Sequence, residues 1–235
     1  MRIVHVHVPK TAGTALRKAF ETHSNPKLRV CPAIFEKQYE SVNLADFDVF
    51  SGHISYTLAK KIGGDMITVL RDPVDRFLSV YYFWRQLYAK GVERTRNTTL
   101  ATNFDLADFV TLFDERTLIE EFYNRLTWQV ASSFALDGPE GRSSWRQQFR
   151  GNEMAVLELA KENLSKFKIV GFQERYSSVL TKLNQLYGLH IEDKKINVTE
   201  EREQMGSLNS AVLSKIYQWV YLDIELYKFA FRTFA

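Results

Sequence analysis

The chain has little of several features that would narrow its class at once. Cys31 is the only cysteine among 235 residues, so no disulfide can form within the chain and no cysteine-based zinc site can be built from it. No apolar run approaches the roughly 20 residues of a membrane span. The opening stretch MRIVHVHVPK is too short and too polar for a signal peptide. We therefore expect a cytoplasmic protein that does not insert into a membrane.

The chain also has no large excess of charge of either sign. The 31 Lys and Arg residues against 28 Asp and Glu leave a formal net charge of +3. This mild basic excess suits an anionic small-molecule ligand and falls short of what a nucleic-acid-binding protein carries. No spacing among the histidines and carboxylates suggests a metal site. The expectation is a protein that binds neither nucleic acid nor a metal ion.

Apolar and aromatic residues are plentiful, at 45% and 14% of the chain, which is enough for the core of one domain over residues 1–235. β-branched runs predict strands and helical spacing of apolar residues predicts helices. The expected strands are Ile3–Val8, Phe47–Ser51, Met66–Leu70 and Lys168–Val170. The expected helices are Thr14–Thr22, Pro73–Lys90, Asp105–Phe113, Thr117–Ser133, Glu153–Phe167, Ser177–Tyr187 and Leu208–Phe234, the last with a possible break.

This alternation predicts an α/β fold of three layers, with a parallel sheet flanked by helices and a helical C-terminal half. Ligands of such sheets bind at the carboxyl ends of the strands. The residues that follow each strand are therefore the first place to look for a site.

The first strand is followed by PKTAGTAL, a loop of small residues that opens a helix. Backbone N–H groups in such a loop can converge on an anion, and the candidate binding residues are Lys10, Thr11, Ala12, Gly13, Thr14 and Ala15. The lysine adds a positive charge and the two threonines add hydroxyl donors. Lys10 precedes the only glycine of this loop, so the loop is not a Walker A motif. Its absence disfavours a nucleoside-triphosphate hydrolase. By itself the loop fits an ordinary turn with a solvated lysine equally well.

A second motif, RDPVDRFLSVYYF, follows the Met66–Leu70 strand. It places Arg71 at a strand end and Ser79 about two turns into the next helix. An arginine fork with a nearby hydroxyl suits a terminal phosphate. Arg76 lies one helical step of three before Ser79 and could support it. The ordinary alternative is that it pairs with Asp72 or Asp75.

Histidine is a suitable general base because its pKa lies near neutrality, and His53 is the best of the 5 histidines. It follows the Phe47–Ser51 strand directly after Gly52. The alternative for this residue is a buried histidine satisfied by a backbone carbonyl. We interpret His5 and His7, in the first strand, as structural, and expect surface positions for His23 and His190.

PKTAGTAL together with RDPVDRFLSVYYF resembles the sulfotransferases that use 3′-phosphoadenosine 5′-phosphosulfate (PAPS), particularly the carbohydrate branch with the heparan sulfate 2-O-sulfotransferases. The resemblance implies that the first motif binds the 5′-phosphosulfate and the second the 3′-phosphate. His53 matches the proposed base of that branch, and Ser51 stands where the family can carry another histidine. Asn197 and Thr199 lie where related enzymes close the nucleotide site. Residues 91–151 match nothing in the family.

The resemblance implies in-line transfer of a sulfuryl group from PAPS to a hydroxyl acceptor, with a carbohydrate as the expected acceptor and 3′-phosphoadenosine 5′-phosphate (PAP) as product. Lys10 and the loop amides would serve the leaving phosphate and His53 would activate the acceptor, without a divalent metal. A basic segment could touch an acidic glycan, although a solvated helix end and loop explains it better; it comprises Arg85, Lys90, Arg94 and Arg96.

Three other interpretations stay open. A nucleotide or sugar kinase would need magnesium and acidic ligands, which the sequence does not offer. A non-catalytic module that binds a nucleotide or glycan would keep the phosphate receptors without needing His53. A trimmed, membrane-anchored Golgi enzyme is the third, and the opening Met1 followed directly by a strand argues against it.

Overall fold

The structure is a computed structural model of the chain, and it describes residues 1–22, 28–112, 116–131, 151–191 and 203–235. The chain forms two compact units. The first comprises residues 1–71, 126–197 and 225–235, and the second comprises residues 72–125 and 198–224. The single domain expected over residues 1–235 stays a prediction, with these units as its parts.

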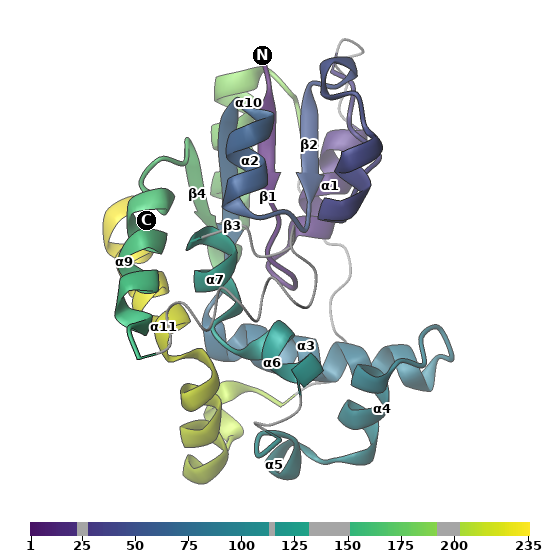
Figure 1. Cartoon of the computed structure of the whole chain (residues 1–235), viewed down its shortest axis with the longest axis vertical. Coiled ribbons are helices and arrows are strands. Elements are labelled where there is room, and N and C mark those ends of the chain that lie inside the picture. Colours follow the sequence, from purple (N-terminus) through teal and green to yellow (C-terminus); the bar gives the residue numbers. More distant parts are fainter. Residues whose placement is uncertain (23–27, 113–115, 132–150, 192–202) are drawn as a thin grey trace. The chain divides into compact units, whose positions relative to one another are not determined.

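A parallel sheet of four strands is the framework of the first unit (Figure 1). The strands are β1 (Ile3–Val6), β2 (Val49–Gly52), β3 (Asp65–Leu70) and β4 (Ile169–Phe172), in the order β2-β1-β3-β4. Every residue of β1, β2 and β4 is buried, as is typical of parallel strands covered on both faces. The predicted parallel sheet flanked by helices is confirmed.

Helices α1 (Gly13–Thr22) and α10 (Tyr176–Tyr187) share a hydrophobic core with the sheet. Leu16 and Phe20 of α1 and Leu183 of α10 lie in one cluster with Ile3 and Ile67. Helix α2 (Tyr56–Ile62) contacts β1. The remaining elements of this unit are η1 (Glu36–Ser41), η2 (Leu44–Asp46), most of α7 (Arg125–Ala131), α9 (Glu153–Leu164), η3 (Gln173–Arg175) and the end of α11 (Ser210–Phe234).

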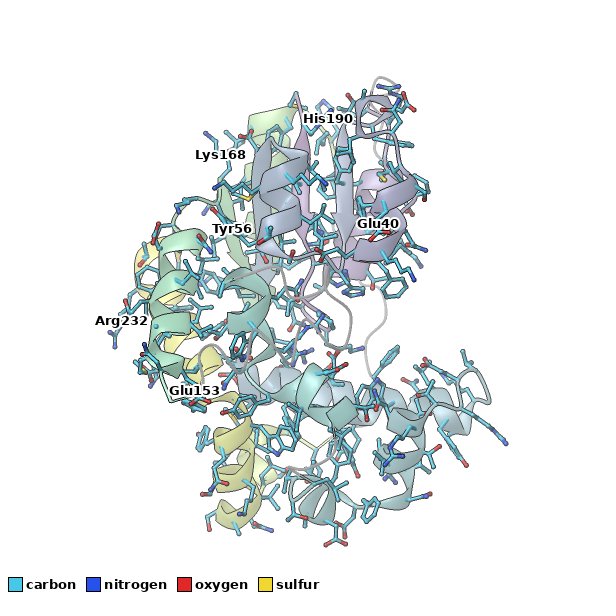
Figure 2. All side chains as sticks on the ribbon, viewed as in Figure 1. Glu40, Tyr56, Glu153, Lys168, His190 and Arg232 are labelled. Carbon is cyan, nitrogen blue, oxygen red and sulfur yellow. The ribbon has the colours of Figure 1, made fainter. Side chains whose placement is uncertain are left out.

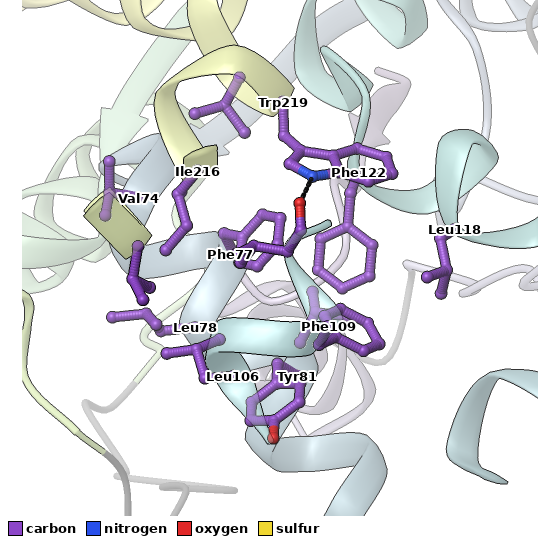
Figure 3. Close-up of a cluster of buried hydrophobic side chains, with 14 of the residues drawn as sticks. Val74, Phe77, Leu78, Tyr81, Leu106, Phe109, Leu118, Phe122, Ile216 and Trp219 are labelled. Carbon is purple, nitrogen blue, oxygen red and sulfur yellow. Dashed lines mark hydrogen bonds between the residues drawn. The ribbon is translucent and has the colours of Figure 1, made fainter. Parts of the chain in front are cut away.

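The second unit is helical and has an aromatic core. It contains α3 (Pro73–Ala89), α4 (Arg96–Asn103), α5 (Leu106–Phe109), α6 (Arg116–Phe122), η4 (Met205–Ser207) and the first part of α11. The rings of Phe77 and Phe122 lie 4.3 Å apart between centroids. Trp219 packs against both rings and donates a hydrogen bond to the carbonyl of Val110 at 2.9 Å (Figure 3).

Helix α11 is interrupted at Val220, whose φ of −126° and ψ of 20° are not helical. Asn124 satisfies the two backbone groups that the break releases. Its N–H donates to the carbonyl of Trp219, and its Oδ1 accepts from the N–H of Leu222, both at 2.9 Å. The predicted break in this helix is thereby confirmed, and its cause is a residue far away in the sequence.

Two predicted helices differ from the structure. The helix expected over Thr117–Ser133 divides into α6 and α7, because Asn124 between them has a positive φ of 48°. The helix expected over Asp105–Phe113 is confined to Leu106–Phe109 within the described residues. Helices α2 and α4 were not predicted, although Ser55 and Thr95 cap their first turns through side-chain oxygens.

Only part of the basic segment that begins at Arg85 is solvated. Arg85 is half-buried and donates to the carbonyl of Ala101 at 2.7 Å and to the hydroxyl of Tyr81 at 3.0 Å. For this arginine the solvated interpretation is wrong, because its guanidinium donates hydrogen bonds to carbonyls at the end of α4. Lys90 and Arg94 are exposed, as expected.

None of the helices that the structure describes is both long and apolar enough to cross a membrane.

Candidate functional site

The loop after β1 has an unusual backbone. Lys10 and Ala12 adopt positive φ values of 66° and 67°, although neither is glycine. Left-handed residues at alternate positions turn successive backbone N–H groups toward a shared concavity, which is a common way of holding phosphate. Non-glycine residues bear this conformation at a cost, and such strain gathers at ligand sites. A loop with this backbone can hold an anion.

Helix α1 begins directly after this loop, at Gly13, where glycine is required. A Cβ on this residue would lie 1.8 Å from Cδ2 of His7, so the first turn of α1 rests on the imidazole ring. His7 is 5% exposed and supports the start of α1, a structural role of the kind expected for it. The N-terminus of α1 has no acidic residue in its first turn, which leaves the positive end of its dipole for an anion.

The two threonines of the loop differ in what they can offer. Thr11 is buried, and its hydroxyl donates to the carbonyl of Val8 at 2.8 Å. A hydroxyl has a single proton to donate, so in this structure the proton of Thr11 is used within the protein, and its role as a donor to the ligand stays a prediction. Its backbone N–H still belongs to the loop. Thr14 is exposed and Lys10 is half-buried.

Arg71 braces the loop from the carboxyl end of β3. It is 8% exposed, and its Nη1 donates to the carbonyl of Lys10 at 2.9 Å. This contact arises because β1 and β3 are neighbours and run parallel, so that their carboxyl ends meet. A guanidinium carries several N–H donors in a planar fork, so this bond leaves Arg71 able to contact an anion as well.

His53 directly follows β2 and faces the same edge of the sheet. Its ring stacks on that of His7 at 4.2 Å between centroids, and its Nδ1 lies 3.2 Å from the carbonyl oxygen of His7. A carbonyl only accepts, so Nδ1 carries the proton. The neutral ring then has its lone pair on Nε2, the form that a general base needs. The alternative was a buried histidine satisfied by a backbone carbonyl. The carbonyl contact is present, but His53 is only half-buried.

Comparison with known proteins decides the family. The model of the sulfotransferase family matches residues 1–230. The chain belongs to the sulfotransferase family. A crystal structure of the mouse sulfotransferase SULT7A1 complexed with PAP is similar at 13% identity and a TM-score of 0.43. That match covers 92% of this chain and 63% of the mouse chain. The comparison with curated proteins gives no match.

His5 is the third imidazole of the stack that His53 and His7 form. His5 is fully buried, stacks on His7 and contacts the hydroxyl of Ser51 at 2.8 Å. Burial, with smaller contributions from the charges of His53 and Arg17, lowers the pKa of His5 from 6.5 to about 3. His5 is thus a neutral structural residue. Ser51, where the resemblance allows another histidine, is its partner.

Three useful residues escaped the sequence analysis. Arg17 of α1 donates to the carbonyls of Ser51, Cys31 and Ala33, and so ties the helix to the end of β2. Phe35 stacks on His53 at 5.6 Å and is 59% exposed. Gln129 contacts the carbonyl of His7. For Phe35 the only signal in the sequence was an aromatic residue close to a proline. Arg17 and Gln129 carried no such signal.

The remaining predicted residues are placed as follows. Ala15 is buried in α1. Ser79 lies in α3, in the second compact unit, and is 2% exposed. Asn197 and Thr199, like His23, lie outside the described residues. His190 is exposed just beyond α10 (Figure 2), as expected. Within the described residues no group of His, Cys, Asp or Glu side chains is arranged to hold a metal ion.

Proposed function

We propose that this sulfotransferase transfers a sulfuryl group from PAPS to a hydroxyl of an acceptor, with PAP as the second product. The observation that carries the proposal is the pair of left-handed residues, Lys10 and Ala12, in the loop that opens α1. Together with the start of α1 at Gly13, this backbone forms a receptor for the 5′-phosphosulfate. Family membership supports this assignment over a kinase or a module without activity.

The chemistry of the proposal follows from these side chains. PAPS supplies the sulfuryl group, and its sulfur–oxygen bond breaks as the acceptor oxygen bonds to sulfur. Lys10 and the loop amides, Thr11 to Ala15, stabilise the charge that collects on the departing phosphate. Nε2 of His53 takes the proton of the acceptor hydroxyl. The protein then supplies positive charge, position and a base, and in the proposal no metal is needed.

The second phosphate needs its own receptor. On the resemblance of the second motif, we assign the 3′-phosphate to Arg71 and Ser79, an arginine fork and a hydroxyl of the kind that suits a terminal phosphate. Asn197 and Thr199 are assigned to closing the nucleotide site, on the resemblance alone. We also propose a cytoplasmic location for a single-domain enzyme, supported by the lone cysteine.

For the acceptor we propose a carbohydrate. A sugar whose hydroxyl lies within hydrogen-bond reach of His53 has its own ring next to Phe35, because Phe35 stacks on His53. The side chain of Phe35 is 59% exposed. The backbone around this phenylalanine is held in place: Gln38 Oε1 accepts from the N–H of Phe35 at 2.9 Å, and Ile34 accepts from the N–H of His53 at 2.7 Å. An exposed ring on a fixed backbone is a ready platform for the apolar face of a sugar.

The test is transfer of labelled sulfate from PAPS to a panel of glycans and phenols. The carbohydrate assignment predicts transfer to glycans, and a Phe35→Ala variant with a KM for the glycan raised about tenfold or more, while Phe35→Tyr stays near wild type. Val92→Ala, which truncates another exposed apolar residue, is the matched control. Transfer to phenols alone would show that the acceptor class is wrong and leave the sulfotransferase assignment standing.

A further inference from the structure

Gln129 of α7 is 1% exposed and contacts the same backbone carbonyl as His53. Its Nε2 donates to the carbonyl of His7 at 3.0 Å and to that of Ile54 at 2.9 Å. Both partners are acceptors only, so the amide nitrogen must face them. The same carbonyl of His7 accepts from Nδ1 of His53. One side chain thus holds the residue after His53 and the oxygen that His53 binds.

We infer that Gln129 is a positioning residue, which holds His53 in the tautomer that leaves the lone pair on Nε2. The inference rests on the proposed function, in which His53 is the base. The proton of a neutral imidazole stays on the nitrogen that has an acceptor in line with it. Here the acceptor is the His7 carbonyl, which also accepts the hydrogen bond from Gln129. Loss of that bond removes a hydrogen bond from the same oxygen that accepts from Nδ1 of His53.

A purely structural role does not explain a glutamine at this position. Its Oε1 is buried, and in the described part of the chain it has no hydrogen-bond partner. A buried acceptor without a partner is destabilising, so an apolar side chain of the same shape would remove that cost. What glutamine supplies in return is the pair of donors for the carbonyls of His7 and Ile54.

The experiment compares Gln129→Leu with wild type in sulfuryl transfer, in PAP binding by calorimetry and in the histidine ring signals of ¹⁵N NMR. The signals of His53 are assigned with a His53→Ala variant. We expect wild type to carry the proton of neutral His53 on Nδ1. In Gln129→Leu the proton distributes between both nitrogens, and kcat falls roughly tenfold to a hundredfold because the base is misplaced. PAP affinity stays unchanged.

Val130→Ala is the matched control, because Val130 is a fully buried neighbour in the same helix whose side chain only packs. It is expected to lower stability and to leave the tautomer and kcat as in wild type. A Gln129→Leu enzyme with wild-type kcat and tautomer would overturn the inference. So would a wild-type His53 with its proton on Nε2, a result that stands even if the variant fails to fold. Absence of turnover in wild type would count against the proposed function instead, since the NMR result decides the role of Gln129 by itself.

Discussion

The guanidinium of Arg71 donates a hydrogen bond from Nη1 to the carbonyl oxygen of Lys10 at 2.9 Å. The sequence suggested two separate phosphate receptors, one after β1 and one after β3. This bond joins them, because the arginine of the second motif fixes the backbone of the first. Loss of Arg71 is therefore expected to affect both ends of the nucleotide.

Arg71→Lys keeps the positive charge but loses the planar fork, so it cannot brace the loop and contact a phosphate together. We expect PAP affinity to fall about tenfold to a hundredfold, the equivalent of about one charge-assisted hydrogen bond. Calorimetric titration with PAP measures this. Arg29→Lys, at an exposed ion pair with Asp48, should bind PAP as wild type does. Equal binding by both variants would contradict the bracing role.

The left-handed backbone at Ala12 makes a graded prediction. Ala12→Gly relieves strain of about 1 kcal/mol and is expected to keep PAP binding. Ala12→Val puts a branched side chain in the same conformation, so the loop should leave it and PAP affinity should drop at least about tenfold. Calorimetry on the two variants gives the comparison. If valine is tolerated as well as glycine, the loop does not bind its ligand in this conformation.

Burial of neutral His5 makes stability depend on pH. Its folded pKa of about 3 lies below the value of 6.5 for an exposed imidazole. Between these values the unfolded chain takes up a proton on His5 that the folded chain does not, so the free energy of unfolding falls as pH decreases. The slope from this group is about 1.4 kcal/mol per pH unit, and it vanishes above pH 6.5.

Urea unfolding at a series of pH values checks this dependence. His5→Asn keeps a polar side chain near Ser51 but cannot titrate, and it serves as the comparison. We expect the variant to be less stable at neutral pH and to lose less stability than wild type below pH 6.5. Parallel curves for both proteins would mean that His5 is not buried as a neutral ring.

Asn124 is predicted to matter for stability through the break in α11. Asn124→Gly keeps the left-handed backbone but leaves the N–H of Leu222 without its partner, at about 1–3 kcal/mol of unfolding free energy. Asn124→Ala adds about 1 kcal/mol for the strained φ. Asn124→Asp retains an acceptor oxygen for the N–H of Leu222. This variant therefore separates the loss of the hydrogen bond from the other effects of substitution. Chemical denaturation gives the values. A glycine variant as stable as wild type would exclude this role.

Much of the sheet and the phosphate loop could be predicted, because their signals are local. Buried parallel strands are continuous apolar runs, and the loop combines small residues with one lysine at a strand-to-helix junction. His53 was found from its position at a strand end. Its supporting residues were not: His7 lies 46 residues away from it and Gln129 acts from a helix 122 residues beyond His7.

The division of the Thr117–Ser133 helix illustrates the same limit. Its apolar spacing continues through Asn124, so helical periodicity predicts one element. The structure breaks it because the backbone and side chain of Asn124 pair with Trp219 and Leu222. Such long-range pairing overrides local propensity, and a single sequence carries no record of it.

The most direct test of the central claim is sulfuryl transfer from labelled PAPS to the glycan panel by wild type, Lys10→Ala and His53→Ala, with PAP binding measured on each protein. The account predicts that wild type transfers, that both variants lose at least about a hundredfold in kcat, and that His53→Ala still binds PAP with unchanged affinity. Wild type that binds no PAP would contradict the account at its centre.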